Sequence, residues 1–272
     1  MDIAIIGASG TIGRTVVNMI AAEGILSCDQ RLILVGHAHS SSSRSLPGLA
    51  VDLADAYDET CPAVEVITEP GEIPGDVIIM AAGATLNAPQ EGARSTRDDL
   101  AEANLPIFDA YARRIADHGH GSEIVICISN PNELAVAVFA RHLGRDRVIG
   151  MGAFLDSLRF RKEIAHDLGV RRQRVHAFMV GEHGAGMVPL WSNVHVYGLR
   201  GAEHESTVAS LRGGHRAGAY PQELARVRTK LLELLSDQRV QSAYAYVDRF
   251  PADIRAALKP FVTHFSLSLI HI

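Results

Sequence analysis

The sequence predicts an α/β protein in which a doubly wound parallel sheet is followed by a smaller α+β domain. Three observations lead to this fold class. Short apolar runs alternate with helix-like stretches through the first half of the chain, a glycine-rich turn joins the first run to the first helix, and the chain becomes more polar and helical after about residue 148. Continuous apolar runs separated by helices are typical of parallel strands buried on both faces.

The expected elements alternate along the first half of the chain. Strands are expected at residues 3–6, 31–35, 64–67, 77–80 and 124–128, and helices at 12–22, 97–116 and 132–143. Further helices are expected at 155–168, 221–235 and 252–258. The serine-rich run at 40–45 is expected to form a mobile loop. We therefore place a dinucleotide-binding domain at 1–148 and a catalytic domain at 149–272.

Composition excludes several classes of protein. A chain of 272 residues that is 47% apolar can bury a full core, and a net charge of -5 gives no general attraction to nucleic acid or an anionic membrane. No run is long enough to span a membrane, and the N-terminus lacks the basic segment of a secretory signal. The three cysteines are widely spaced, which favours reduced thiols in the cytoplasm over a disulfide framework or a metal site.

A glycine-rich turn follows the first expected strand. It reads Gly7, Ala8, Ser9, Gly10, Thr11, Ile12 and Gly13. Glycines there allow a tight turn and a close approach of the backbone to a pyrophosphate, whose charge is stabilised by the helix N-terminus. The turn predicts a Rossmann-type dinucleotide site, with an ordinary strand-to-helix turn as the alternative.

The end of the second expected strand bears on the choice of cofactor. NAD sites usually carry an acidic residue there to bind the ribose hydroxyls, whereas this chain has Gly36 and His37. A missing carboxylate followed by serines and Arg44 is compatible with a 2′-phosphate. The sequence therefore favours NADP over NAD, and NAD stays open.

Two later segments carry candidate catalytic groups. Asp156 and Arg159 are three residues apart, so they share one face of a helix. His183 lies between glycines in the run Gly-Glu-His-Gly at 181–184. A carboxylate can orient an imidazole, and a guanidinium can bind a substrate carboxylate with two parallel hydrogen bonds.

With these motifs, nearly the whole chain resembles the lactate/malate dehydrogenase family. The matching segments, besides the turn at 7–13, are Ala-Ala-Gly at 81–83, Arg-Asp-Asp-Leu at 97–100, Ile-Ser-Asn-Pro-Asn at 128–132, Leu-Asp-Ser-Leu-Arg-Phe-Arg at 155–161, Gly-Glu-His-Gly at 181–184 and Met-Val-Pro-Leu-Trp-Ser at 187–192. The resemblance implies a cytoplasmic enzyme of the tricarboxylic acid cycle, active as a homodimer or homotetramer, that needs no metal.

The resemblance also assigns roles to residues. His183 would donate and accept the proton, Asp156 would hold the imidazole of His183 and favour its charged form, and Arg159 would bind the substrate carboxylate. Asn130 would lie beside the substrate and the nicotinamide, and Arg97 would sit on a mobile loop that closes over the site. The remaining cofactor contacts would come from Gly83, Asn104 and Ile128.

The substrate is less sharply indicated. Relatives that bind a dicarboxylate carry an arginine six residues before Arg97, where this chain has Glu91. An alignment with a short insertion puts Gln90 there and leaves Arg94 as a substitute, so glutamine favours pyruvate and arginine favours oxaloacetate. The run 187–190 resembles malate dehydrogenases, and malate with oxaloacetate is the expected substrate pair. Lactate or another 2-hydroxy acid is the alternative.

The C-terminal domain is expected to be truncated. Family members continue for several tens of residues beyond 261–265, whereas this chain closes with 266–272, which resembles translated sequencing adapter. A nucleotide-binding fragment without turnover is therefore a further alternative. A short-chain reductase is excluded, because the residues four before the three lysines are Leu158, Arg226 and Arg255 rather than tyrosine.

Overall fold

The computed structural model describes residues 1–37, 41–68, 71–84, 97–181, 186–213 and 219–270. Two compact units make up the chain, Met1–Met151 and Gly152–Ile272. The division falls after residue 151 rather than at 148, because Val148–Gly150 forms a strand that pairs with the sheet of the first unit. No helix of the described ranges is long and apolar enough to cross a membrane.

A six-stranded parallel sheet forms the first unit, and its order is β3-β2-β1-β4-β5-β6. Its strands are β1 (Ile3–Ile6), β2 (Arg31–Val35), β3 (Ala63–Ile67), β4 (Val77–Met80), β5 (Ile124–Cys127) and β6 (Val148–Gly150). Its helices are α1 (Thr11–Ala22), α2 (Ser41–Ala56), α3 (Arg97–His118) and α4 (Asn132–Leu143). The predicted doubly wound parallel sheet is confirmed.

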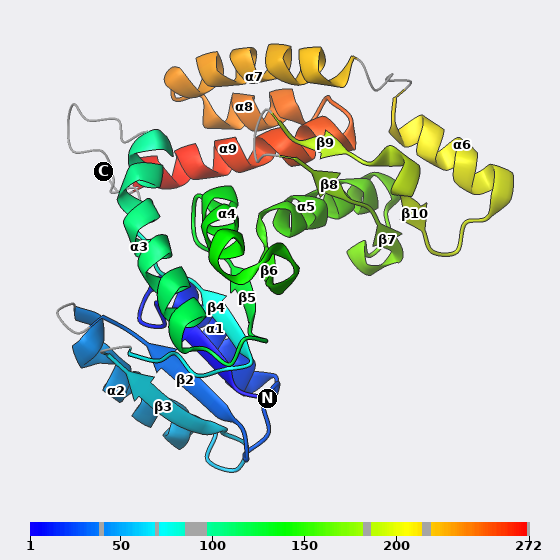
Figure 1. The fold of residues 1–272 in the computed structure, drawn as a ribbon. Helices are drawn as coiled ribbons and strands as arrows, with labels where there is room; N and C mark the ends of the chain where they lie inside the picture. Colours follow the sequence, from blue (N-terminus) through cyan, green and yellow to red (C-terminus); the bar gives the residue numbers. More distant parts are fainter. Residues whose placement is uncertain (38–40, 69–70, 85–96, 182–185, 214–218, 271–272) are drawn as a thin grey trace. The chain divides into compact units, whose positions relative to one another are not determined.

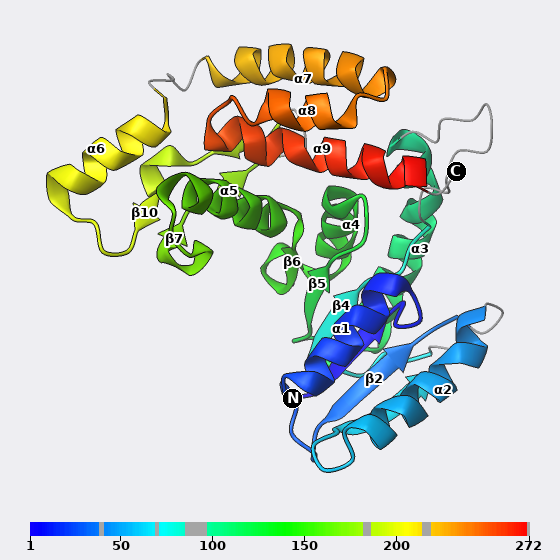
Figure 2. The ribbon, with the colours of Figure 1, turned by 180° about the vertical axis from the view of Figure 1, so that it is seen from behind.

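Alternation of side chains along β1 explains why both faces of this sheet are covered. Even-numbered residues of β1 lie in one apolar cluster with Phe108 of α3 and Phe139 of α4. Odd-numbered residues lie in another with Val17 of α1 and Leu53 of α2. Helix α3 is in front in Figure 1, and α1 and α2 are in front in Figure 2. A strand buried on both faces must be apolar at every position, which is why its sequence is continuous.

The expected loop at 40–45 is wrong for the part that the structure describes. Residues 41–45 begin α2, and Ser40 lies outside the described residues. Serine is favoured at the start of a helix, so a serine run does not by itself indicate a loop. The apolar residues that fix this helix come later, with Leu46 and Leu53 fully buried against the sheet.

The second unit combines helices with two small antiparallel sheets, as expected for an α+β domain. The strands pair as β7 with β10 and β8 with β9. The strands are β7 (Val175–His176), β8 (Met179–Val180), β9 (Val188–Pro189) and β10 (His195–Val196). The helices are α5 (Gly152–Leu168), α6 (Gly201–Leu211), α7 (Tyr220–Ser236), α8 (Val240–Val247) and α9 (Ala252–Ile270).

Helix α9 contributes to both apolar clusters of the second unit. Ala257 and Leu258 pack with α7 and α8, and these three helices lie side by side in Figure 1. Ala252 and Ala256 pack instead with Phe160 of α5. The helix expected at 252–258 continues past Pro260 to residue 270. Helix α9 is therefore the element that α5 and the α7–α8 pair share.

The thiols of the first unit should differ sharply in reactivity. Cys28 is exposed, whereas Cys127 is fully buried, and this burial raises the pKa of the Cys127 thiol to about 12. Because the thiolate is the reactive form, we expect a thiol reagent to label Cys28 in the folded protein and Cys127 only after unfolding. Peptide mass spectrometry after timed labelling measures this, with urea-unfolded protein as the control. Rapid labelling of Cys127 in the folded protein would contradict its burial.

Candidate functional site

The glycine-rich turn brings backbone segments into close contact just before α1. Gly7 has a φ of +83°, and a Cβ there would lie 2.7 Å from the Ala82 backbone. A Cβ on Gly13 would overlap the Gly7 carbonyl oxygen. Helix α1 begins at Thr11 without a side-chain cap on its N-terminus and without an acidic residue in its first turn. Close backbone and an uncapped helix N-terminus fit a dinucleotide phosphate.

This turn lies where the strand order reverses. β1 is paired with β2 on one side and with β4 on the other, and the carboxyl ends of parallel strands at such a point form the usual ligand crevice of these sheets. The Gly7 turn follows β1, and the run at 81–83 follows β4. The structure therefore brings two of the sequence-predicted cofactor segments to one edge of the sheet.

Asn104 of α3 hydrogen-bonds the segments that follow β4 and β5. It is fully buried, and its Oδ1 accepts a hydrogen bond of 2.6 Å from the Ala84 amide. Its Nδ2 donates to the Ala84 carbonyl oxygen at 3.1 Å and to the Asn130 carbonyl oxygen at 2.7 Å. A Cβ on Gly83 would lie 3.0 Å from the same Oδ1. Asn104 thus acts on the backbone that surrounds the expected cofactor position.

Sequence reasoning missed two polar residues that shape this edge. Ser129 is buried, and its hydroxyl donates to the carbonyl oxygen of Met80 at 3.0 Å or of Ala82 at 2.6 Å. Asn132 Nδ2 donates to the Cys127 carbonyl oxygen at 2.6 Å. Both flank Asn130 in the run that follows Ile128, so the motif itself was the available signal. They fix the segment on which Asn130 lies.

The end of β2 carries no carboxylate. Gly36 is buried and donates its amide proton to the Ile67 carbonyl oxygen at 2.8 Å, while His37 is exposed. Residues 38–40, next along the chain, lie outside the described residues. The two positions singled out from the sequence therefore sit at the carboxyl end of a strand next to β1, as the cofactor prediction requires.

The second unit brings Asp156 and Arg159 into contact on α5. Arg159 Nη1 donates to Asp156 Oδ1 at 2.9 Å, and the Asp156 side chain is 4% exposed against 28% for Arg159. The carboxylate is thus buried, and the guanidinium remains partly accessible. This pair can bind an anion and orient a neighbouring base.

Ser157 and Arg161 connect α5 to the strand that leads toward His183. The Met179 amide donates to Ser157 Oγ at 3.0 Å, and Arg161 Nε donates to the Ala177 carbonyl oxygen at 2.9 Å. Both residues lie within the motif Leu-Asp-Ser-Leu-Arg-Phe-Arg at 155–161, but the sequence alone assigned them no role. They hold the backbone of 177–179 along the helix that carries Asp156.

Several predicted residues lie outside the described part of the chain. These are His183, Arg94 and the side chain of Arg97, whose backbone begins α3. Within the described residues, no group of three or more His, Cys, Asp or Glu side chains is arranged to hold a metal ion.

Tyr220 at the start of α7 is a buried polar group of the second unit that the sequence did not indicate. Its hydroxyl is buried and makes no hydrogen bond among the described residues. Burial, together with the charges of Asp253 and Asp156, raises the pKa of Tyr220, so the phenol stays protonated. Nothing in the local sequence at the start of α7 signals this position.

Comparison with known proteins identifies the family. Residues 1–150 match the model of the lactate/malate dehydrogenase NAD-binding domain, and residues 153–211 match that of the lactate/malate dehydrogenase α/β C-terminal domain. The chain belongs to the lactate/malate dehydrogenase family. The fold agrees, because the lactate dehydrogenase of Cryptosporidium parvum in complex with lactic acid and NAD matches with a TM-score of 0.63 at 28% identity, covering 77% of this chain and 62% of that one.

Relatives within the lactate/malate dehydrogenase family differ in their named substrates. An L-2-hydroxycarboxylate dehydrogenase (NAD(P)(+)) of Methanocaldococcus jannaschii is 34% identical over 73% of this chain and 62% of its own. A malate dehydrogenase of Methanosphaera stadtmanae is 31% identical over 73% of this chain and 61% of its own. An L-lactate dehydrogenase of Latilactobacillus sakei is 35% identical over 57% of this chain and 47% of its own. The chain thus spans about three fifths of the length of the first two relatives.

Replacing Gly13 with alanine should distort the glycine-rich turn at 7–13 and weaken cofactor binding. Because the added Cβ overlaps the Gly7 carbonyl oxygen, the strand-to-helix turn must shift at a cost of about 1–3 kcal/mol. We expect NADH and NADPH to bind about tenfold more weakly or worse, as measured by fluorescence titration.

Gly48→Ala is the matched control for this variant. Gly48 lies within α2, and a Cβ there meets nothing within 4 Å. It should leave binding unchanged and stabilise the helix by about 0.5–1 kcal/mol. Equal cofactor affinity in the Gly13→Ala and Gly48→Ala variants would refute the phosphate-binding role of the turn.

Proposed function

We propose that the protein is a nicotinamide-dependent dehydrogenase that interconverts a 2-hydroxy acid and a 2-oxo acid. The observation that carries this proposal is the Arg159–Asp156 pair on α5, a guanidinium next to a buried carboxylate in a chain of this family. A partly accessible guanidinium suits a substrate carboxylate, and a buried carboxylate suits an imidazolium.

The chemistry assigns one task to each side chain. Arg159 uses Nη1 toward Asp156, and its other N–H groups would bind the substrate carboxylate. His183 would donate a proton to the carbonyl oxygen during reduction and take it back during oxidation, with Asp156 stabilising its charged form. Arg97 and Asn130 would contact the substrate. A bound nicotinamide supplies or accepts the hydride.

The fit of the dinucleotide rests on the first unit. The glycines at 7 and 13 let backbone segments approach more closely than a Cβ would allow, and the N-terminus of α1 carries no side-chain cap. We favour NADP over NAD because Gly36 and His37 put no carboxylate at the end of β2. We further propose that the protein is a homodimer or homotetramer that works in the cytoplasm, in the tricarboxylic acid cycle.

Malate and oxaloacetate are the proposed substrate pair. Arg94 supports this choice, since its guanidinium would form an ion pair with the second carboxylate of oxaloacetate. Lactate and pyruvate are the second candidate, because Gln90 stands at the corresponding position when the loop is aligned with a short insertion.

Turnover by the 272-residue chain tests the reaction and its substrates together. We expect NADPH-dependent reduction of oxaloacetate to exceed that of pyruvate, and NADPH to serve at least as well as NADH. Initial rates for the four combinations, read at the nicotinamide absorbance, measure this. Cofactor binding without turnover of either acid would refute the dehydrogenase in favour of a nucleotide-binding protein. Faster pyruvate reduction would refute the malate assignment alone.

Arg159→Lys tests the carboxylate-binding role. Lysine keeps the charge but loses the planar pair of donors, which costs about 1.5–3 kcal/mol. We therefore expect kcat/KM for the 2-oxo acid to fall by about 10- to 150-fold. The KM for the coenzyme should not change.

Arg226→Lys on α7 is the control for Arg159→Lys. Its guanidinium is exposed and lies 3.9 Å from Glu223, so the change should have no kinetic effect. An Arg159→Lys enzyme with unchanged kcat/KM would refute the assignment.

A further inference from the structure

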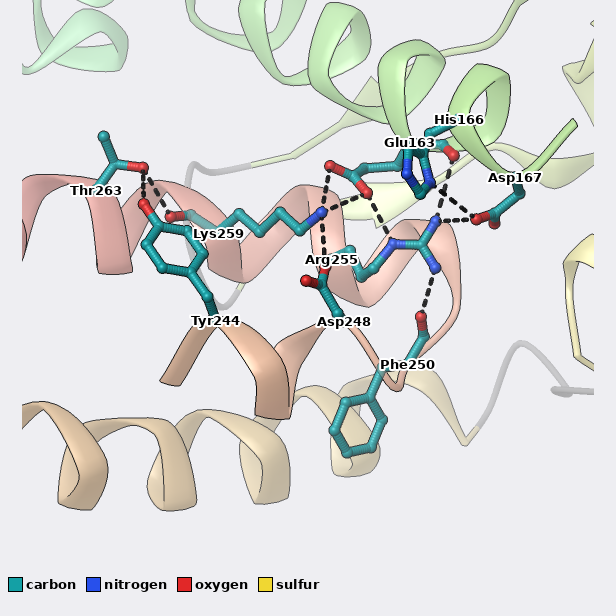
Figure 3. A network of polar contacts seen from close by, with 9 residues as sticks. All are labelled: Glu163, His166, Asp167, Tyr244, Asp248, Phe250, Arg255, Lys259 and Thr263. Carbon is teal, nitrogen blue, oxygen red and sulfur yellow. Dashed lines mark hydrogen bonds and ion pairs between the residues drawn. The ribbon is translucent and has the colours of Figure 1, made fainter. Parts of the chain in front are cut away.

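A cluster of five charged residues connects α5 to α9 and to the residue that follows α8. It consists of Glu163, Asp167, Asp248, Arg255 and Lys259, and we call it the α5–α9 ion cluster. Figure 3 shows the two cations reaching from α9 toward the carboxylates. The side chains of Glu163 and Arg255 are each 8% exposed. None of the five is a residue to which the proposed reaction gives a role.

Arg255 holds α5 at three points within about one helical turn. Its Nε donates to Glu163 Oε2 at 2.7 Å, and its Nη2 reaches Asp167 Oδ1 at 2.6 Å. The same Nη2 donates to the backbone carbonyl oxygen of Glu163 at 3.2 Å. Because the guanidinium is planar and rigid, these contacts restrict both the rotation of α5 and its position along its axis.

Lys259 adds a second cation to the same carboxylate. Its Nζ lies 3.0 Å from Glu163 Oε1 and 2.9 Å from Oε2, and 2.8 Å from Asp248 Oδ1. Burial opposes the charge of this lysine, but the hydrogen bonds to Asp248 and Glu163 outweigh it and raise the pKa of Lys259. Glu163 is therefore held by two cations one turn apart on α9 (Figure 3).

The energetics of such a cluster favour a role in positioning. The free-energy cost of removing charged groups from water offsets most of their mutual attraction inside a protein. Apolar residues of similar volume would therefore stabilise the folded protein about as well. Directional contacts between buried charged groups can specify the register of two helices, which is the best-attested role of such groups. Phe160 of α5 and Ala256 of α9 already pack in one apolar cluster. The three carboxylates and two cations of the ion cluster are therefore not needed to hold the two helices together.

Glu163 shares a helix face with the proposed site residues. It lies four residues after Arg159 and seven after Asp156, and both spacings return to one side of a helix. A second contact supports the same face, because Phe160 packs edge-on against Trp191 at 5.0 Å between ring centroids. Trp191 in turn donates its indole proton to Asp253 of α9 at 2.8 Å. A change in the register of α5 must therefore displace Asp156 and Arg159.

We propose that Glu163 is a positioning residue for the substrate site. Held by Arg255 and Lys259, it fixes the rotation and axial position of α5 and so the place from which Arg159 binds the substrate carboxylate. The proposal rests on the proposed dehydrogenase function and deepens it.

Glu163→Gln and Arg255→Lys test this role in the full chain. Glu163→Gln keeps the side-chain shape and removes the shared charge, and Arg255→Lys keeps the charge and removes the planar donors. We expect the KM for the 2-oxo acid to rise about tenfold, with the KM for the coenzyme unchanged. A purely structural role predicts the opposite division, since loss of folded enzyme lowers the apparent kcat and leaves KM alone. That result would overturn the proposal.

A milder variant tests the same role if Glu163→Gln and Arg255→Lys do not fold. Lys259→Met leaves the Glu163–Arg255 pair in place, and we expect a rise in KM of about threefold. Lys230→Met is the matched control, because Lys230 makes an exposed ion pair with Glu233 on α7 at 2.7 Å. Equal KM values in Lys259→Met and Lys230→Met would count against the cluster.

Trp191 provides a readout that does not need turnover. It is the single tryptophan of the chain, and it contacts both α5 and α9. We expect Glu163→Gln to change its emission and to increase its quenching by acrylamide, while Lys230→Met leaves both as in the wild type. If the wild type reduces no 2-oxo acid, the proposed function fails by itself. Unchanged Trp191 emission and quenching in Glu163→Gln would then overturn the positioning of α5 separately.

Discussion

The Glu163 carboxylate of α5 accepts hydrogen bonds from Arg255 and Lys259 of α9, and the second unit is organised around this contact. On one side of it, α9 packs against α7 and α8. On the other, Ser157 and Arg161 of α5 hold the backbone of β8 and of the residues before it. The helix that carries Asp156 is therefore restrained from several directions, by charge at one end and by backbone hydrogen bonds at the other.

In the first unit, neutral side chains hold the backbone segments that follow β4 and β5. The turns of this unit must come within contact distance of one another, so glycines stand where any side chain would collide. The buried side chains of Asn104 and Ser129 then hydrogen-bond the carbonyl and amide groups of the segments that follow the strands. Buried amide and hydroxyl groups suit this task because they can satisfy backbone groups without placing a charge beside the expected phosphates.

The first unit was largely predictable, because strands buried on both faces must be apolar throughout and the glycine-rich turn marks the junction of the first strand and helix. The helix α2 was not, since a serine run is compatible with both a loop and a helix start. In the second unit the pairing of Asp156 with Arg159 followed from their spacing. Glu163 could not be found in the same way. A charged residue on a helix is read as exposed, and only the fold shows that Arg255, 92 residues later, covers it.

In the second unit, the helix that carries Asp156 and Arg159 and the cations that hold Glu163 come from different parts of the chain. All of α5 except Gly152 falls within the segment that matches the family's C-terminal domain, 153–211, whereas α7, α8 and α9 lie beyond it. If Glu163 positions α5 as we propose, a substitution in α9 alters the substrate site while the motif residues of the second unit stay the same. Two proteins with identical motifs need not have equal substrate affinity, and the difference would be sought in the helices that the motifs leave out.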